Sequence, residues 1–459
     1  MQHTIKFDAE LIRRYDKSGP RYTSYPTAVQ FNDGFSEIRY REIARETNTS
    51  GRPLSLYFHI PFCSTVCFYC GCNKVVTKDR SRAVPYLQRL HREIEMQGVL
   101  FNRDRTVDQL HWGGGTPTFI SHNEIRALME KTGEHFTLLD DDSGEYSIEV
   151  DPREISEGSL PLLRKLGFNR LSMGVQDFNE KVQLAVNRIQ SREQTLSVLK
   201  EARSLGFRSI NMDLIYGLPF QSVASFSETL EQVIEANPDR LSVFNYAHLP
   251  EMFKPQRRIN ADDLPSAEEK LAILQATIQI LGEAGYVYIG MDHFAKPEDE
   301  LAIAQREGSL YRNFQGYSTH AECDMVAMGN TAISNIGNSF SQNQRSLDDY
   351  FAALDADQLP IMRGYELSAD DRMRRHVITS LICHFELDVS VIEKQFDIDF
   401  QQYFTSELEA LYRMQQDGLL TLGDGVIEVL PAGKLLIRNI CMIFDVYLET
   451  RPQQFSKVI

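Results

Sequence analysis

The sequence predicts an α/β fold: a partial (β/α)6 barrel, preceded by an N-terminal arm and followed by a mainly helical domain. From residue 52 onward, short apolar runs alternate with stretches whose apolar residues recur every three or four positions. Strand, helix and strand in regular succession imply parallel pairing through right-handed crossovers. Six such units fit in the chain, fewer than the eight that close a (β/α)8 barrel, so we expect an open, splayed barrel.

The elements of the barrel follow one another in order. Each predicted strand is a short apolar run with a polar or glycine-rich end; the six are 53–60, 107–112, 146–150, 170–175, 209–215 and 240–246. The clearest helical patterns lie between them, over 84–100, 122–136, 193–207 and 226–236.

The chain changes character after about residue 360, where the pattern reads helix, hairpin, helix. The hairpin turn is Gly423-Asp424-Gly425. This arrangement resembles a winged-helix module, but the segment in the position of a recognition helix, 389–400, is acidic, which argues against DNA contact. We therefore expect a lid or packing domain. The predicted domains are an arm over 1–50 that covers the active site, the barrel and its extension over 51–355, and the C-terminal domain over 356–459.

Composition narrows the class of partner. The chain has 459 residues and a formal net charge of −16, which disfavours nucleic acid. Its seven cysteines are few and odd in number, as in a reducing compartment. Neither a signal peptide nor an uncharged run of 18 residues is evident. These features predict a cytoplasmic protein without a membrane partner, and we expect a monomer because no apolar helix face stands out as unpaired.

Four cysteines are concentrated in ten residues: Cys63, Cys67, Cys70 and Cys72. Three thiolates at the first two spacings can surround one face of a cubane iron–sulfur cluster. Structural zinc sites pair two ligand units that are well separated in sequence, and no second pair follows here. The spacing therefore favours an iron–sulfur cluster over zinc. The other cysteines, Cys323, Cys383 and Cys441, stand singly and are interpreted as buried small hydrophobic residues.

Chemistry in a parallel sheet lies at the carboxyl ends of its strands. Every predicted strand is followed by polar or glycine-rich residues; they are His59 with the cysteines, 113–116, Glu149 with Asp151, Gln176 with Asp177, Asp213, and Ala247 with His248. Any one of them alone reads as a hydrogen-bonded loop residue. Together they predict a ring of functional groups at one end of the barrel.

The cysteine motif, which directly follows the first strand and has Tyr69 before its third cysteine, resembles that of the radical S-adenosylmethionine (SAM) superfamily. Further motifs, spread over nearly the whole chain, resemble those of the oxygen-independent coproporphyrinogen III oxidase family; they include GPRYTSYPTA (19–28), LHWGGGTPT (110–118), IEVDPRE (148–154), DRLSVFNYAHLP (239–250) and FSKVI (455–459). The resemblance implies that one-electron cleavage of SAM yields a 5′-deoxyadenosyl radical. It also implies oxidative decarboxylation of two propionates of coproporphyrinogen III to vinyls, giving protoporphyrinogen IX in haem biosynthesis.

The resemblance assigns roles to individual residues. Cys63, Cys67 and Cys70 are implied to ligate a [4Fe–4S] cluster whose fourth iron binds SAM. The implied contacts to that SAM are Tyr57, Gly114, Glu149 and Ile333. Seven further positions match contacts to a second SAM molecule: Tyr69, Gly115, Thr116, Gln176, Arg188, Asp213 and Ala247.

Tyr57, His59 and Cys72 are the expected catalytic residues. The role of Cys72 stays open between redox chemistry, proton delivery, substrate contact and simple packing. His59 and His293 either contact substrate or the surroundings of a sulfonium group, or are hydrogen-bonded structural histidines. Arg21 and Tyr22 are implied to close over the active site.

The substrate carries four propionates, so arginines are expected to bind it. The candidates are Arg21, Arg312 and Arg375. A flavodoxin-like protein is the expected electron donor. Two other functions compete: a haem carrier with the same fold, and a zinc-stabilised regulator. The carriers lack the 19–28 motif and a cysteine at the position of Cys72, so both features favour the enzyme.

Overall fold

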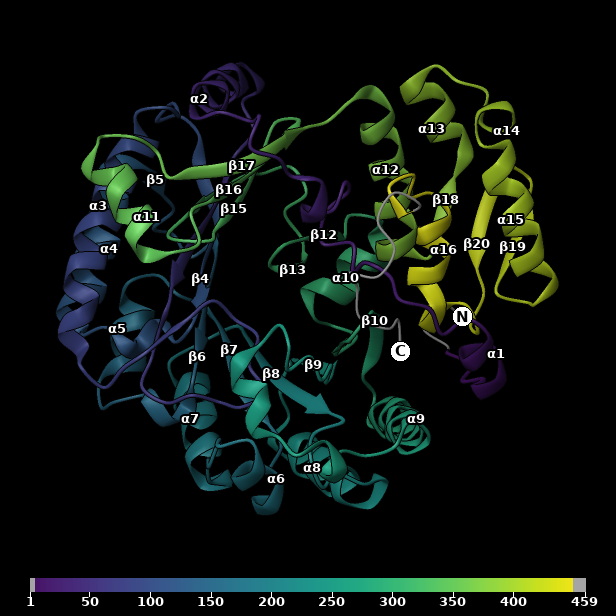
Figure 1. The fold of residues 1–459 in the computed structure, drawn as a ribbon, viewed down its shortest axis with the longest axis horizontal. Coiled ribbons are helices and arrows are strands. Elements are labelled where there is room, and N and C mark those ends of the chain that lie inside the picture. The colour runs from purple at the N-terminus through teal and green to yellow at the C-terminus, as the bar shows by residue number, and fades with distance from the viewer. Residues whose placement is uncertain (1–4, 449–459) are drawn as a thin grey trace. The chain divides into compact units, whose positions relative to one another are not determined.

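The computed structural model describes residues 5–448, which form two compact units. The barrel unit comprises 31–266 and 322–366, and the C-terminal unit comprises 5–30, 267–321 and 367–448 (Figure 1). The three consecutive domains expected from the sequence stay a prediction, and the units follow a different, interleaved division of the chain. The FSKVI motif lies outside the described residues. No helix within 5–448 has the length and apolar character needed to cross a membrane.

The strands of the barrel unit include all six that the sequence predicts. They are β1 (Leu54–Ile60), β2 (Phe62–Cys63), β3 (Val75–Val76), β4 (Thr106–Gly114), β5 (Thr137–Leu138), β6 (Glu145–Val150), β7 (Arg170–Gln176), β8 (Ser209–Tyr216), β9 (Arg240–Asn245), β14 (Asp324–Met328), β15 (Ile333–Ile336), β16 (Ser339–Asn343) and β17 (Ile361–Glu366). The main sheet of this unit runs in the order β9-β8-β7-β6-β4-β1-β14-β15-β16-β17. Pairing is parallel from β9 through β14 and antiparallel from β14 to β17.

One parallel strand was missed by the sequence reasoning. β14 pairs with β1 on the side opposite to β4, so it continues the parallel sheet beyond the six predicted strands. All five of its residues are buried, so the strand has no polar alternation to reveal it. β14 also lies more than 250 residues after β1 in the sequence.

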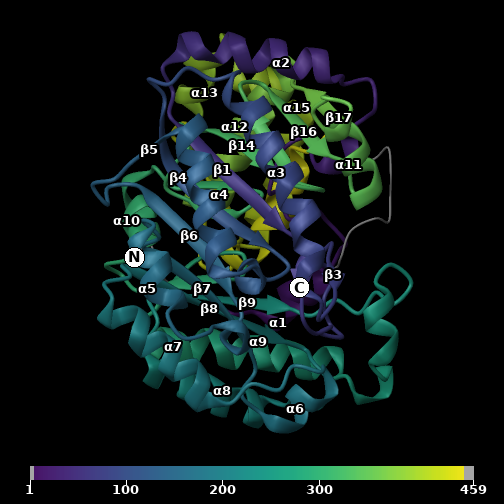
Figure 2. The same cartoon turned by 90° about the vertical axis from the view of Figure 1, so that its left-hand side faces the viewer.

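Helices cover the outer side of this sheet (Figures 1 and 2). The helices of the unit are α2 (Glu37–Glu46), α3 (Ala83–Gly98), α4 (His122–His135), α5 (Ser159–Lys165), α6 (Glu180–Ala185), α7 (Arg192–Ser204), α8 (Val223–Ala236) and α11 (Leu347–Asp355). Register places a row of large apolar side chains on one face of the strands, each at most 2% exposed; the row is Phe58, Trp112, Ile148, Leu171 and Ile210.

Because side chains alternate along a strand, the residues between these apolar positions face the other side of the sheet. In β1 they are Ser55, Tyr57 and His59. Tyr57 lies opposite His111 of β4, and the two rings stack with centroids 5.8 Å apart. The inner face is therefore polar, and it leads to the carboxyl ends of the strands.

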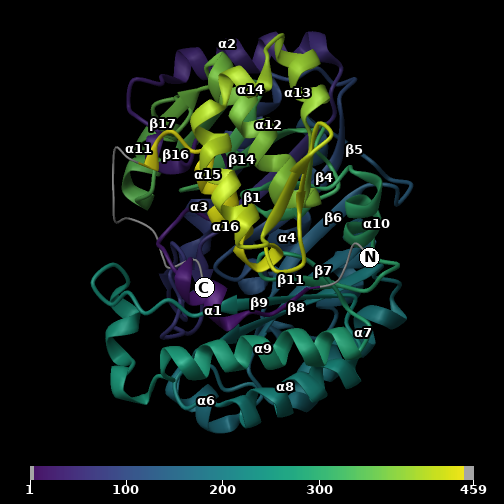
Figure 3. The same cartoon turned by 90° about the vertical axis from the view of Figure 1, so that its right-hand side faces the viewer.

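The C-terminal unit is mainly helical and contains the predicted wing (Figure 3). Its helices are α1 (Ala9–Arg14), α9 (Ala267–Glu283), α10 (Glu300–Glu307), α12 (Ala369–His384), α13 (Val389–Phe396), α14 (Phe400–Tyr403), α15 (Thr405–Gln416) and α16 (Ile437–Ile443). Its strands are β10 (Val287–Gly290), β11 (His293–Ala295), β12 (Tyr311–Asn313), β13 (Gly316–Ser318), β18 (Glu386–Asp388), β19 (Leu420–Gly423) and β20 (Val426–Val429). β18, β20 and β19 form a small antiparallel sheet. The predicted hairpin is confirmed: Asp424 and Gly425 join β19 to β20, both with positive φ.

The turn-forming and aromatic residues of the arm, residues 19–25, make contacts within the C-terminal unit. Arg438 of α16 donates hydrogen bonds to the carbonyl oxygens of Gly19 and Pro20. The Tyr22 hydroxyl donates to Asp445 at 3.0 Å. These contacts anchor the arm to the C-terminal helices, so this segment is an integral part of the unit. That it covers the active site stays a prediction.

Candidate active site

The cysteine motif forms a loop that leaves the carboxyl end of β1 and returns to the barrel unit through the short pair β2–β3. The amide of Val75 donates to the Pro61 carbonyl at 2.7 Å, and the amide of Thr77 donates to the Cys63 carbonyl at 2.9 Å. These bonds close the loop at its base. Cys63, Cys67 and Cys70 therefore lie on one short, tethered segment beside the inner face of the sheet.

Each of these three sulfurs accepts a hydrogen bond from a different neighbour. Thr116 Oγ1 lies 3.6 Å from Cys63 Sγ, Arg188 Nη1 lies 3.7 Å from Cys67 Sγ, and the Cys72 amide lies 3.4 Å from Cys70 Sγ. Hydrogen bonding from Cys72 lowers the pKa of the Cys70 thiol to about 5, whereas desolvation raises that of Cys63 to about 11. Donors aimed at sulfur are the surroundings that cluster thiolates have in iron–sulfur proteins.

The distances between the cysteine sulfurs distinguish a site for a single zinc ion from a site for a [4Fe–4S] cluster. A tetrahedral zinc holds its thiolates about 3.8 Å apart, from a zinc–sulfur distance of about 2.3 Å. Among residues 5–448, no three of the motif's sulfurs lie within 4.8 Å of one another. Ligands to different irons of a cubane are spaced more widely than ligands to one ion. The residues present therefore fit a [4Fe–4S] cluster better than a single zinc.

A glycine run at the end of β4 lies along this loop. The Gly115 amide donates to the Ile60 carbonyl at 2.8 Å, and a Cβ at Gly115 would approach the Pro61 backbone to 2.7 Å. At Gly114, where φ is +118°, a Cβ would come within 2.8 Å of the His59 ring. No residue with a side chain fits at either position, so the run brings bare backbone next to the cysteine loop.

Glu149, at the end of β6, faces the glycine run. It accepts a hydrogen bond from the Gly114 amide at 3.1 Å and lies 3.4 Å from His111 Nε2. Desolvation opposes its ionisation, but the bonds from His111 and Gly114 outweigh that effect and lower its pKa. Its side chain is 46% exposed. The carboxylate is thus charged, oriented and open to a ligand, as a contact to a cationic amino group requires.

His59 links the inner face of β1 to the far side of the loop. Its Nε2 donates to the Asn73 carbonyl at 3.1 Å, and Tyr57 donates to its Nδ1 at 3.2 Å. Burial lowers the pKa of His59 and, together with Glu149, raises that of Tyr57, so the pair consists of a neutral imidazole and a protonated phenol. Catalytic roles for both, and for the exposed Cys72, stay predictions.

The positions matched to a second SAM lie on the same unit, and three of them, Gln176, Asp213 and Ala247, lie at or near the ends of β7, β8 and β9. Asp213 accepts hydrogen bonds from Asn211 and Ser172, and desolvation raises its pKa to about 6. Gln176 adopts a positive φ of 69° at a bulge in β7, which redirects the chain where the strand ends. Thr116 follows the glycine run, Tyr69 lies within the cysteine loop, and Ala247 follows β9 in the sequence, whereas Ile333 begins β15.

Arg188 is held in place by three contacts. Its Nη2 donates to the Gly174 carbonyl at 2.6 Å, and its Nη1 reaches both Asp151 at 3.0 Å and Cys67 Sγ. Arg153, on the turn after β6, reaches the same carboxylate and the same sulfur. Sequence reasoning gave Asp151 no individual role and passed over His111 and Arg153. Arg153 lies within the motif IEVDPRE, so the sequence offered a signal for it. No sequence pattern, however, shows which group the side chain of an arginine in a turn will contact.

The predicted substrate arginines belong to the C-terminal unit. Arg21 forms an ion pair with Asp292 at 2.6 Å, and Arg312 Nε donates to the Arg21 carbonyl at 3.3 Å. Arg375 bonds to the Tyr311 hydroxyl. His293 packs edge-on against Tyr317, which also lies under the Arg312 guanidinium. Their contact with substrate stays a prediction.

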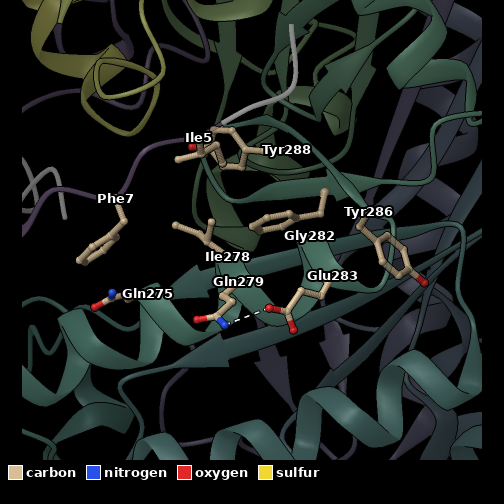
Figure 4. Close-up of a pocket in the computed structure, with 10 residues that line it drawn as sticks. Ile5, Phe7, Gln275, Ile278, Gln279, Gly282, Glu283, Tyr286 and Tyr288 are labelled. Atoms are coloured by element: carbon tan, nitrogen blue, oxygen red, sulfur yellow. Dashed lines mark hydrogen bonds between the residues drawn. The ribbon is translucent and has the colours of Figure 1, made fainter. Parts of the chain in front are cut away.

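The C-terminal unit also contains a pocket of about 430 Å³ between the N-terminal segment and α9 (Figure 4). Its lining is mostly apolar and aromatic, and includes Phe7, Ile278, Tyr286, Tyr288 and Phe294. None of the predicted cluster or SAM ligands lines it.

Comparison with known proteins agrees with this geometry. Residues 57–233 match the radical SAM superfamily, and residues 367–436 match the HemN C-terminal domain. The chain is 56% identical to the oxygen-independent coproporphyrinogen III oxidase of Pseudomonas aeruginosa over 100% of both chains, and 53% identical to that of Escherichia coli over 99% of both. The solved structure of coproporphyrinogen III oxidase (HemN) from Escherichia coli, described as a radical SAM enzyme, superposes with a TM-score of 0.93 at 51% identity, covering 97% of this chain and 100% of that one. The chain belongs to the oxygen-independent coproporphyrinogen III oxidase family of radical SAM enzymes.

Proposed function

We propose that this protein converts two propionates of coproporphyrinogen III to vinyls, giving protoporphyrinogen IX without oxygen. The observation that carries this proposal is the tethered loop of Cys63, Cys67 and Cys70 beside the glycine run and Glu149, in a chain that matches its relatives from end to end. When bound, the cluster and SAM supply a carbon radical that removes hydrogen from the propionate; loss of carbon dioxide and one electron then completes the vinyl.

In this proposal the residues of the chain bind and orient the cluster and SAM, and shield them from solvent. Cys63, Cys67 and Cys70 would hold the cluster, and the iron without a cysteine ligand would be open to the amino and carboxylate groups of SAM. The bare backbone at Gly114 allows close approach of the methionyl group, and Glu149 receives its ammonium. Tyr57 and His59, fixed to each other and to the loop, keep the inner face of β1 in one conformation.

A second SAM is proposed beside the first, held by residues of the cysteine loop, of the segment after β4, of the segment after α6, and of the ends of β7, β8 and β9. The candidates are Tyr69, Gly115, Thr116, Gln176, Arg188, Asp213 and Ala247. Arg188 suits a carboxylate, and Asp213, whose pKa is about 6, suits a ribose hydroxyl better than a cation at low pH. A monomeric, cytoplasmic enzyme with a flavodoxin-like electron donor completes the proposal.

Anaerobic turnover tests the function directly. Reconstituted protein is incubated with coproporphyrinogen III, SAM and a reductant, and protoporphyrinogen is measured after oxidation to the porphyrin. The wild type is expected to form product, and Cys63→Ser is expected to lose it, because the serine hydroxyl is a poor iron ligand. Cys441→Ser, a buried cysteine outside the loop, is the matched control and keeps activity. Continued turnover by Cys63→Ser, or haem binding without turnover by the wild type, contradicts the proposal.

A further inference from the structure

Two arginines converge on one sulfur of the cysteine loop. Arg153 Nη2 and Arg188 Nη1 each lie 3.7 Å from Cys67 Sγ. Cys63 and Cys70 accept from a threonine hydroxyl and a backbone amide, and the Lys74 ammonium, which donates to the Cys70 carbonyl at 3.1 Å, also acts on both thiols. Cys67 differs from them in that two guanidinium groups donate to its sulfur.

A single carboxylate holds both guanidinium groups. Asp151 Oδ2 lies 2.6 Å from Arg153 Nη2 and 3.0 Å from Arg188 Nη1, and Asp151 Oδ1 lies 3.0 Å from Arg153 Nε. Asp151 and Arg188 are 8% and 7% exposed. The trio therefore keeps a net charge of about +1 beside Cys67, in surroundings where charge is poorly screened.

Local backbone geometry fixes Arg153 in this position. It lies in the 3₁₀ turn Pro152–Glu154 that directly follows β6, and the Asp151 side chain caps this turn by accepting from the Arg153 amide at 3.0 Å. The turn is thus closed by the same carboxylate that binds the side chain. A guanidinium so constrained loses little further freedom when it donates to a sulfur.

We propose that Arg153, held by Asp151, is a positioning residue that raises the reduction potential of the cluster through Cys67. This inference rests on the proposed function, because it takes the three cysteines as ligands of a [4Fe–4S] cluster. Reduction adds one electron to the cluster, and N–H donors and positive charge at a ligand sulfur stabilise that added negative charge. Arg188 shares the contact but is also a candidate SAM ligand, so Arg153 gives the cleaner test.

The experiment measures the midpoint potential of the reconstituted cluster by EPR-monitored redox titration, with SAM absent. Arg153→Met is expected to lower the reduced-to-oxidised ratio at a fixed potential about tenfold, which is ~59 mV for a one-electron couple. Arg164→Met is the control: it removes the same charge from the same unit, but from an ion pair with Asp142. Its potential is expected to equal that of the wild type.

Iron and sulfide content are measured for every variant. If Arg153→Met fails to hold the cluster, Arg153→Gln, which keeps neutral N–H donors, is titrated in its place. A wild-type potential in the loaded variant, or an equal fall in Arg164→Met, overturns the inference while leaving the proposed function intact. A wild-type protein without a [4Fe–4S] signal overturns both, and absence of product from a loaded wild type overturns the proposed function alone.

Discussion

Two carboxylates of the barrel unit each accept a hydrogen bond from a glycine amide, but their pKa values shift in opposite directions. Glu149 accepts the amide of Gly114, at the end of β4, and Glu93 of α3 accepts the amide of Gly329, just after β14. Both glycines have positive φ. The pKa of Glu149 is lowered, whereas desolvation raises the pKa of Glu93 to about 7.

The remaining partners explain the difference. Glu149 has the imidazole of His111 beside it and is 46% exposed. Glu93 is fully buried, and its other donors, Asn343 and Tyr350, are neutral. A hydrogen bond from a glycine amide is thus insufficient to keep a carboxylate charged in a protein interior. Glu149, beside the end of β4, carries a charge suited to a ligand, whereas Glu93, beside the end of β14, belongs to a buried structural network.

The largest expected effect concerns Glu93 and the pH dependence of folding. Its carboxyl loses its proton near pH 4.5 when unfolded and near pH 7 when folded. The folded state therefore binds more protons in between, so the stability contribution is complete below about pH 4.5 and declines as pH rises through about 7. The decline amounts to roughly 3 kcal/mol. Glu93→Gln is expected to flatten the urea-unfolding free energy between pH 5.5 and 8. An unchanged slope contradicts the network's role.

A smaller effect is expected for Glu149→Gln, which keeps shape but removes charge. Charge-assisted hydrogen bonds are worth about 1.5–3 kcal/mol, so SAM affinity should fall about 10- to 100-fold. Anaerobic calorimetry on the reconstituted protein measures this. Glu93→Gln is the matched control, and it should bind SAM as the wild type does. Equal losses in both variants would show that the two strand ends do not differ as described.

The smallest effect tests the cause of the low pKa of Glu149. His111→Leu removes its imidazole partner, so the pKa of Glu149 should rise. SAM binding is then expected to weaken a few-fold at pH 6, with recovery toward pH 8, because the carboxylate must be ionised to bind an ammonium. Affinity titrations across this range measure it, with Ser147→Ala, which removes only the partner of His111 Nδ1, as the milder comparison. A profile identical to that of the wild type would mean that Gly114 alone holds the charge.

Periodicity and motif spacing predicted the six strands from β1 to β9, the helices α3, α4, α7 and α8 between them, and the hairpin joined by Asp424 and Gly425. These features depend on neighbours within a few residues, so local sequence contains them. β14 was missed: after the buried Asp324 its residues are all apolar, so the strand shows no alternation. Its pairing with β1 depends on a partner more than 250 residues away.

The same division holds at the site. Cysteine spacing favoured an iron–sulfur cluster over zinc, because the types of the ligands and the intervals between them can be read from the sequence. The distance from Arg153 to Cys67, the stacking of Tyr57 on His111 and the opposite behaviour of Glu93 and Glu149 were decided only by tertiary structure. Sequence fixes which groups are present. A pKa or a potential depends on burial and on partners brought from other strands, and those exist only once the sheet has formed.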